Sequence, residues 1–221
     1  MNVEQARFNM IEQQIRPWDV LDPAVLALLG RARREDFVPA AHRALAFVDT
    51  QVPLKEGAAA GACMLEPKVE ARLLQELALQ PGDRVLEVGT GSGFMAALLA
   101  GMSVQVITLE IDAALARQAE ENLCRAAITN ARVVNADGHA GWAEGGPYDA
   151  IVLSGSVAEV PAALRQQLKP GGRLVAIVGD LPIMRARLHT RGHGEGWSHV
   201  DLFDTVAPRL LHFGEPSRFR F

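Results

Sequence analysis

The chain contains few cysteines and no long hydrophobic run. Its two cysteines, Cys63 and Cys124, stand in unrelated surroundings without a CxxC spacing. This excludes a disulfide-stapled secreted scaffold and predicts reduced thiols. No uncharged apolar stretch reaches the roughly 18 residues that a membrane-spanning helix needs. Glu4, Arg7 and Glu12 near the start do not fit the basic and then apolar order of a signal peptide. We therefore expect a soluble, cytoplasmic protein that does not bind membranes.

An excess of positive charge is also missing. The 22 Lys and Arg residues are outnumbered by 26 Asp and Glu residues, which gives a net charge of −4 over 221 residues. Such a chain has no global field to hold a phosphate backbone, so we expect no nucleic-acid partner. The hydrophobic fraction of 49% and the charged fraction of 22% are typical of a globular domain. We expect one domain over residues 1–221, with a helical cap in 1–80 and a sheet core in 81–221, and the oligomeric state stays open.

The histidines do not follow a metal-binding pattern. His189, His193 and His199 lie close together, but the glycines between them predict a hairpin turn rather than a helix. The helical His-x₃-His face that binds zinc is therefore absent, and we expect no metal. We predict that these three are solvated turn residues and that His139 lies in a surface loop.

The first third of the chain reads as helical. Apolar residues at helical spacing predict a helix over Val3–Ile15, and Met10, Ile11 and Ile15 are expected in the core. Asp22 and Pro23 supply an N-cap and a first-turn proline for a helix that runs to about Ala32. The small, glycine-containing stretch Lys55–Ala62 predicts a mobile loop. A further helix is expected over Lys68–Leu79.

From Arg84 onward, short apolar runs alternate with helical stretches, which is typical of βαβ units and a parallel sheet. Two later strands joined by the turn Arg191–Gly196 predict an antiparallel hairpin at the end of that sheet. The expected strands are Arg84–Val88, Val104–Leu109, Ala131–Asn135, Ala150–Leu153, Leu174–Val178, Ile183–Thr190 and Trp197–Val206, and the expected helices are Phe94–Ala100, Ala113–Ala126 and Ala158–Leu168.

The segment VLEVGTGSG, Val85–Gly93, joins a buried strand to a helix through a glycine turn. Glycines at Gly89, Gly91 and Gly93 let the backbone turn tightly and approach a ligand. Backbone N–H groups at the start of the next helix then face that ligand. We predict that the turn, with its intervening residues Thr90 and Ser92, binds a cofactor.

Two further strand ends strengthen this prediction. Glu110 and Ile111 end the second strand, and an acidic residue about 20 positions after the first glycines suits ribose hydroxyls. Asp137 and Gly138 follow the third strand at the same edge of the sheet. Ligands of open α/β sheets bind at this edge, so we expect an adenosine-type cofactor. The GxGxG spacing disfavours a nicotinamide cofactor, whose pattern is GxGxxG.

These motifs, taken in order, resemble class I S-adenosylmethionine-dependent methyltransferases, whose fold implies a doubly wound, Rossmann-like, mostly parallel seven-stranded sheet. LKPGG (Leu168–Gly172) belongs to the same class I pattern. A narrower resemblance is carried by four segments, REDFVP (Arg34–Pro39), AFVDTQVPL (Ala46–Leu54), GTGSGF (Gly89–Phe94) and YDAIVLSGSVAEVP (Tyr148–Pro161). These segments resemble the protein-L-isoaspartate O-methyltransferases. The resemblance implies S-adenosyl-L-methionine as cofactor, S-adenosyl-L-homocysteine as product, and a protein or peptide isoaspartyl or D-aspartyl carboxylate as acceptor. By this resemblance Glu110 holds the ribose, and Asp137-Gly138 lies by the adenine.

The acceptor side departs from the family pattern. Where the family has a GxGQTISQP-like segment, this chain reads KEGAAAGACMLEP over Lys55–Pro67. The resemblance places Leu65 at the family's catalytic serine, Cys63 at its threonine and Ala62 at its glutamine. A carboxylate acceptor is ionised near pH 7 and needs no general base. Because Leu65 stands at the serine position, two alternatives remain besides isoaspartyl methylation: methylation of a different acceptor, or cofactor binding without turnover.

Three side chains near the expected site could have either a functional or a structural role. Cys63 has no neighbouring base to activate its thiol, so we predict a small filler rather than a reactive group. Ser154 and Ser156 follow the fourth expected strand. They fit an acceptor pocket and a structural turn equally well.

Overall fold

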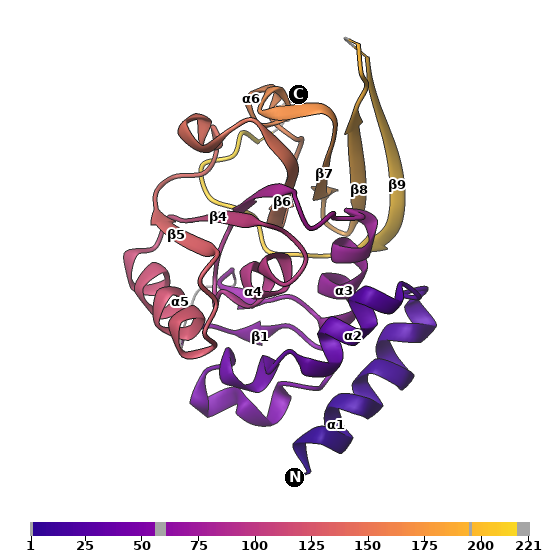
Figure 1. The fold of residues 1–221 in the computed structure, drawn as a ribbon, viewed down its shortest axis with the longest axis vertical. Coiled ribbons are helices and arrows are strands. Elements are labelled where there is room, and N and C mark those ends of the chain that lie inside the picture. Colours follow the sequence, from indigo (N-terminus) through magenta and orange to yellow (C-terminus); the bar gives the residue numbers. More distant parts are fainter. Residues whose placement is uncertain (1, 56–60, 195, 216–221) are drawn as a thin grey trace, which may run out of the picture.

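A twisted seven-stranded sheet forms the centre of the molecule (Figure 1). The computed structural model describes residues 2–55, 61–194 and 196–215. The strands lie in the order β5-β4-β3-β6-β7-β8-β9. All neighbours from β5 to β7 are parallel, whereas β7–β8 and β8–β9 are antiparallel. The bounds are β3 Arg84–Val88, β4 Gln105–Glu110, β5 Ala131–Asn135, β6 Tyr148–Val157, β7 Leu168–Asp180, β8 Ile183–Arg191 and β9 Trp197–Thr205.

Alternation along the central strands gives the sheet two apolar faces. Val85 of β3 pairs with Val106 of β4 and Ala150 of β6, and all three belong to one buried cluster. The next residue of each strand (Leu86 in β3) points to the other face and joins a second cluster. Both faces therefore need a cover, which is the condition for a doubly wound sheet.

Helices provide most of that cover. One face carries α3, α4 and α5 together with the N-terminal segment, and the other carries α6 and the chain around the short helix η5. The bounds are α3 Pro67–Glu76, α4 Phe94–Ala100, α5 Ala113–Arg125, η5 Ala143–Gly145 and α6 Ala162–Gln166. The predicted fold class, including the C-terminal antiparallel hairpin, is confirmed.

The N-terminal cap, here residues 2–55 with the β2 strand and α3, lies beneath the sheet in Figure 1. Its predicted second helix is confirmed, because the Asp22 carboxylate accepts N–H bonds from Ala24 and Val25 and Pro23 opens the first turn. Met10, Ile11 and Ile15 are buried, as expected. The bounds are α1 Val3–Met10, π-helical η1 Ile11–Ile15, η2 Arg16–Trp18, α2 Pro23–Arg31, η3 Arg34–Asp36, η4 Ala40–Leu45, β1 Val52–Pro53 and β2 Cys63–Met64.

Several predicted boundaries were wrong. The helix expected over Ala158–Leu168 is reduced to α6, because β6 continues to Val157 and Pro161 disfavours a helical conformation in the residue before it. The helix expected to reach Leu79 ends at Glu76, since Ala78 adopts a positive φ of 43°. Strands β6 and β7 are longer than their apolar runs. Most of the predicted loop Lys55–Ala62, namely residues 56–60, lies outside the described residues.

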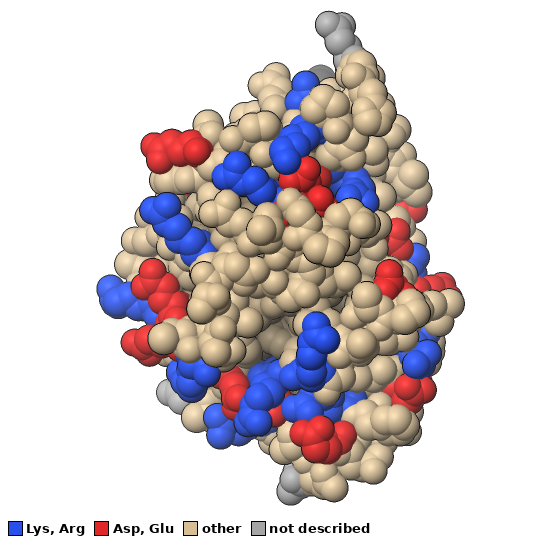
Figure 2. Space-filling view, in the orientation of Figure 1, with Lys and Arg blue, Asp and Glu red and all other residues tan. Residues whose placement is uncertain are grey.

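The chain order reverses beside β3, whose two neighbours β4 and β6 are reached in opposite directions. A crevice opens at the carboxyl ends of strands at such a point. Acidic and basic side chains are interspersed over most of the face in Figure 2, and several basic side chains gather at its lower centre beside acidic ones. None of the described helices combines the length and hydropathy required to cross a bilayer.

Candidate active site

A cavity of about 450 Å³ lies at the carboxyl ends of β3, β4 and β6. This volume suits a nucleoside-sized ligand. A smaller cavity of about 30 Å³ adjoins it and shares Cys63, Gly89, Gly91 and Ser154 with it. The larger cavity is lined by Leu54, Gly61, Ala62, Cys63, Val88, Gly89, Gly91, Leu109, Glu110, Ile111, Asp112, Leu115, Ala136, Asp137, Gly138, Ser154, Arg209, Leu210, Leu211 and Phe213.

The glycine turn after β3 forms the floor. Gly89, Gly91 and Gly93 have φ values of 92°, 53° and 84°, a region that side chains strain to occupy. A Cβ on Gly89 would lie 2.9 Å from Leu210 Cδ2. Gly89 and Gly91 line the larger cavity, whereas Gly93 lines neither cavity and lies against Ala119 of α5. The turn therefore brings bare backbone to the cavity and lets α4 pack against α5.

Thr90 and Ser92 contribute to the smaller cavity rather than the larger one. The Thr90 hydroxyl is 2.5 Å from the Thr108 hydroxyl, and the Ser92 hydroxyl accepts the Phe94 N–H at 3.3 Å. The Ser92 carbonyl accepts the Asn122 amide N–H at 2.9 Å. Both side chains are buried and hold the turn in shape. Their prediction as cofactor-binding residues stays a prediction.

Glu110 and Ile111 lie where β4 ends, as expected, and both line the larger cavity. Glu110 is only 6% exposed, and its two carboxylate oxygens accept the Gly91 N–H at 2.8 Å and the Asp112 N–H at 3.0 Å. These bonds join the glycine turn to the end of β4 and fix the carboxylate. The remaining lone pairs are placed to accept hydroxyl donors from a ligand.

Asp137 and Gly138 line the same cavity after β5. Burial would raise the pKa of Asp137, but hydrogen bonds from His212 and from the His139 N–H outweigh it and lower that pKa to about 2. The His212 Nδ1 lies 2.6 Å from Asp137 Oδ2. Gly138 packs against Val88, where a Cβ would lie 2.4 Å from Cγ1. This position therefore requires glycine, and Asp137 is held as a carboxylate.

Glu87 is a member of the site that the sequence reasoning missed. It is 0% exposed within β3, and its carboxylate accepts hydroxyl bonds of 2.7 Å each from Thr108 and Ser154. Burial raises the pKa of Glu87 to about 8 in spite of these hydroxyl donors. The signal that could have revealed it is a charged residue inside an otherwise apolar strand. A buried carboxyl with a raised pKa in a cavity wall is a candidate functional group.

The two serines left open by the sequence have different surroundings. Ser154 lines both cavities and donates to Glu87. Ser156 is fully buried, and its hydroxyl donates to the Ala207 carbonyl at 2.8 Å. Ser154 therefore belongs to the site, whereas Ser156 fastens the C-terminal segment to β6.

That C-terminal segment, residues 207–213, is a second feature that sequence reasoning missed. The Ser156 N–H donates to the Pro208 carbonyl at 2.7 Å, and the Leu210 N–H donates back to the Ser156 carbonyl at 2.9 Å. The segment therefore runs along β6 and places apolar side chains, among them Leu210 and Phe213, on the larger cavity. We call the strand-end residues Gly89, Gly91, Glu110, Asp137 and Ser154 the strand-end wall.

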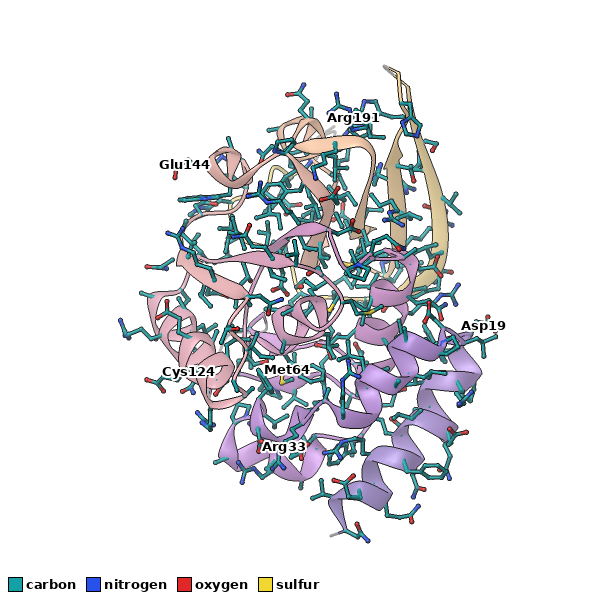
Figure 3. All side chains as sticks on the ribbon, in the orientation of Figure 1. Asp19, Arg33, Met64, Cys124, Glu144 and Arg191 are labelled. Atoms are coloured by element: carbon teal, nitrogen blue, oxygen red, sulfur yellow. The ribbon has the colours of Figure 1, made fainter. Side chains whose placement is uncertain are left out.

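The opposite side of the smaller cavity comes from the N-terminal cap. Cys63, Leu65 and Glu70 line it, and we call these three residues the cap wall. Burial raises the pKa of the Cys63 thiol to about 12, in agreement with a filler rather than a nucleophile. Leu65 is buried at the cavity. Figure 3 shows the neighbouring Met64 between the cap helices and α4, in the interior of the molecule.

The histidine prediction was partly wrong. His193 is exposed in the hairpin turn, but His189 is 9% exposed in β8, opposite His199 of β9. Burial lowers the pKa of His189 to about 4. β8 runs to Arg191, so His189 is a strand residue rather than a turn residue. His139 is exposed, as expected. Within the described part of the chain, no cluster of three His, Cys, Asp or Glu residues could hold a metal ion.

Comparison with known proteins adds a family to this geometry. The family model for protein-L-isoaspartate(D-aspartate) O-methyltransferase matches residues 5–195. A protein-L-isoaspartate O-methyltransferase of Methylorubrum populi is 43% identical over 176 residues, which cover 80% of this chain and 81% of that protein. One from Brucella anthropi is 35% identical over 202 residues, covering 91% of each chain.

Solved structures support the fold. A protein-L-isoaspartate O-methyltransferase of Plasmodium falciparum, crystallised with S-adenosyl-L-homocysteine, gives a TM-score of 0.76 at 23% identity. The match covers 95% of this chain and 98% of that one. A second protein-L-isoaspartate O-methyltransferase structure gives a TM-score of 0.75 at 24% identity, covering 96% of this chain and 66% of that one. At these identities the likeness is one of fold.

Proposed function

The chain belongs to the protein-L-isoaspartate(D-aspartate) O-methyltransferase family, and from this premise we propose that it methylates isoaspartyl or D-aspartyl carboxylates of proteins and peptides. As a member of this family it is an S-adenosylmethionine-dependent O-methyltransferase. The single observation that carries the proposal is the cavity of about 450 Å³ at the ends of β3, β4 and β6. Its strand-end wall offers bare backbone and carboxylates.

The residues present fit the cofactor. Gly89 and Gly91 would lie along its amino-acid portion, where a Cβ has no room. Glu110, beside Ile111, would accept bonds from the ribose hydroxyls. Asp137 and Gly138 would lie by the adenine. When bound, S-adenosylmethionine supplies a sulfonium-activated methyl group. The Glu110 carboxylate on the same cavity complements its positive charge.

The chain contributes alignment rather than acid–base chemistry. Carboxyl groups of aspartyl type have a pKa near ~4, so the acceptor is already a nucleophile at neutral pH. Bringing it into line with the methyl group and excluding water lowers the barrier by roughly 7–11 kcal/mol when the geometry is good. The apolar C-terminal segment with Leu210 and Phe213, together with Leu65 of the cap wall, supplies this exclusion.

One observation favours a second candidate: the same methyl transfer to a different acceptor. The cap wall has the apolar side chain of Leu65 at the position where the family resemblance places a serine hydroxyl. A missing transition-state donor costs about 3 kcal/mol. An acceptor that does not need this donor would therefore be methylated better than an isoaspartyl peptide.

We further propose that the protein works in the cytoplasm. Cys63 and Cys124 are both free thiols in the structure, which suits a reducing compartment. The proposed partner there is a protein or peptide substrate that carries the damaged aspartyl residue.

The test is methyl transfer from S-[methyl-³H]adenosylmethionine to an isoaspartyl peptide. The control is the peptide of the same sequence with normal aspartate. It has the same charge, but the other of the residue's two carboxyl groups is the free one. We expect a base-labile methyl ester on the isoaspartyl peptide alone. Equal labelling of the two peptides, or no labelling of either beside labelling of other acceptors, would favour the second candidate.

A further inference from the structure

Arg34 of η3 is the bulkiest fully buried side chain among the described residues, with only 1% of its surface exposed. Burying a guanidinium costs free energy unless hydrogen bonds and an opposite charge compensate for the lost water. Arg34 lines neither cavity. Its contacts must therefore explain why a cation stands inside the N-terminal cap.

Three contacts surround the Arg34 guanidinium. One nitrogen forms an ion pair with the Glu70 carboxylate of α3, which is itself buried. A second nitrogen donates to the Leu65 carbonyl at 2.7 Å. The guanidinium carbon lies 4.9 Å from the centre of the Phe94 ring, and Phe94 is the first residue of α4 after the glycine turn.

Two of these partners, Glu70 and Leu65, belong to the cap wall of the smaller cavity. The third, Phe94, follows directly on the glycine turn that forms the opposite side. The rigid, forked guanidinium of Arg34 therefore contacts residues from both sides of the cavity. Arginine suits this task because its planar fork donates in several fixed directions at once.

The cap also contains a matched comparison. Arg7 of α1 is buried, pairs with the buried Glu35 at 2.8 Å and lies 5.7 Å from the centre of the Phe47 ring. Neither Arg7 nor Glu35 lines either cavity. A buried ion pair is often replaced by apolar residues without loss of stability. Stability alone therefore does not account for the Arg34–Glu70 pair, whose partners form the cavity wall.

We propose that Arg34 is a positioning residue, which acts through the Leu65 carbonyl and Glu70 to hold the cap wall at the distance from the glycine turn that acceptor alignment requires. The role in alignment depends on the proposed function, whereas the holding of the wall is a property of the fold. The two parts can be tested separately.

The first readout is amide hydrogen exchange of the cap-wall segment, residues 61–70, in the full chain. The test variant is Arg34→Met with Glu70→Leu, which removes both charges together and leaves none buried unpaired. The control is Arg7→Met with Glu35→Leu. We expect exchange in 61–70 to accelerate about tenfold in the test variant only, because the anchor of the Leu65 carbonyl is lost. Exchange in β3 should be unchanged in both.

The second readout is methyl transfer to the isoaspartyl peptide. In the test variant we expect kcat/KM to fall about tenfold, with the dissociation constant of S-adenosylhomocysteine within about twofold of wild type. Thermal unfolding should give similar midpoints for test and control variants. If the double variant does not fold, Arg34→Lys keeps the charge but not the fork, and a smaller effect on the same two readouts is expected.

The outcomes separate the two claims. Unchanged exchange in 61–70, or equal acceleration in the Arg7/Glu35 control, overturns the positioning role. If wild type does not methylate the peptide, the proposed acceptor is wrong, and the exchange result still decides whether Arg34 holds the wall. Faster exchange with unchanged kcat/KM would show that the wall is held but takes no part in alignment, which also overturns the proposal.

Discussion

The two walls of the cavity are assembled in different ways. The strand-end wall consists of residues at the ends of adjacent parallel strands, and short bonds such as Gly91 N–H to Glu110 join them. The cap wall comes from β2 and α3, outside the seven-stranded sheet. It is positioned by Arg34, which lies 31 residues from Leu65 in the chain. The sheet fixes the first wall, whereas the second depends on a buried side chain.

This difference predicts that substitutions in the two walls have different effects. A change in the strand-end wall disturbs the sheet edge and the proposed cofactor site together, because the Glu110 carboxylate at the end of β4 accepts the Gly91 N–H of the glycine turn. Leu65 and Glu70 of the cap wall line only the smaller cavity, so a change in either alters the acceptor side. Leu65, at the position where the resemblance places a serine, is such a change. We therefore expect substitutions in the strand-end wall to affect cofactor affinity and substitutions in the cap wall to affect turnover.

The largest effect is expected from Gly89→Val. Its Cβ would lie 2.9 Å from Leu210 Cδ2 and its φ of 92° strains any side chain. We predict that affinity for S-adenosylhomocysteine falls about 100-fold or more, as measured by calorimetric titration. Gly30→Ala is the control, because nothing lies within 4 Å of its added Cβ inside α2. An affinity for Gly89→Val within a few-fold of wild type would place the ligand elsewhere.

Glu87→Gln should stabilise the folded protein and at the same time weaken ligand binding. The pKa of Glu87 is raised to about 8, chiefly by burial. Between about pH 4.5 and pH 8 the folded chain therefore keeps a proton that the unfolded chain has lost, so wild type loses stability as pH rises through this range. Glutamine does not titrate. We predict that the variant's melting temperature exceeds that of wild type by a margin that grows from pH 5 to pH 8, reaching about 5 °C.

The same variant should bind S-adenosylhomocysteine less well, by about tenfold at pH 8, since a carboxyl that is partly ionised at this pH no longer attracts the ammonium group of the ligand. Differential scanning calorimetry and titration with S-adenosylhomocysteine measure the two effects. The control is Glu120→Gln, an exposed position on α5. Wild type and Glu87→Gln losing stability in parallel across this pH range would show that Glu87 does not titrate as described.

Sequence reasoning was accurate where the signal is local. Strand and helix periods predicted β3, α4 and β5 to the residue. Glu110, Ile111, Asp137 and Gly138 line one cavity, and their contact with a cofactor stays a prediction. It failed where the contact is distant in the chain. Arg34 meets Glu70 across 36 residues, and no local pattern reveals that pairing. The C-terminal segment reaches the cavity through contacts with distant residues, among them Ser156, which bonds to its backbone.

Leu65→Ser restores a hydroxyl to the cap wall and should sharpen the distinction between the walls. We predict that kcat for the isoaspartyl peptide rises about fivefold, whereas the protein loses roughly 2 kcal/mol of stability through the buried leucine. Steady-state kinetics and chemical denaturation measure these effects. Leu65→Ala is the matched control, since it removes the same apolar volume without adding a hydroxyl. Equal kcat for the two variants would show that the added hydroxyl does not affect turnover.

The smallest effect is expected from His212→Ala. The His212 Nδ1 lies 2.6 Å from the Asp137 carboxylate, and His212 has a φ of 63°. Removing the imidazole frees that carboxylate for a ligand, and we predict about twofold tighter binding of S-adenosylhomocysteine. His193→Ala, in the exposed hairpin turn, should not change the affinity. Weaker binding by His212→Ala would mean that the imidazole contacts the ligand itself.

Calorimetric titration with S-adenosylhomocysteine, on wild type and on Glu110→Ala, tests the cofactor site on which the whole account depends. Glu110 joins β4 to the glycine turn and lines the cavity. We predict one-to-one binding by wild type, about 100-fold weaker binding by Glu110→Ala, and wild-type binding by the exposed α5 variant Glu121→Ala. No binding by wild type, or equal binding by Glu110→Ala, would contradict the assignment of the strand-end wall.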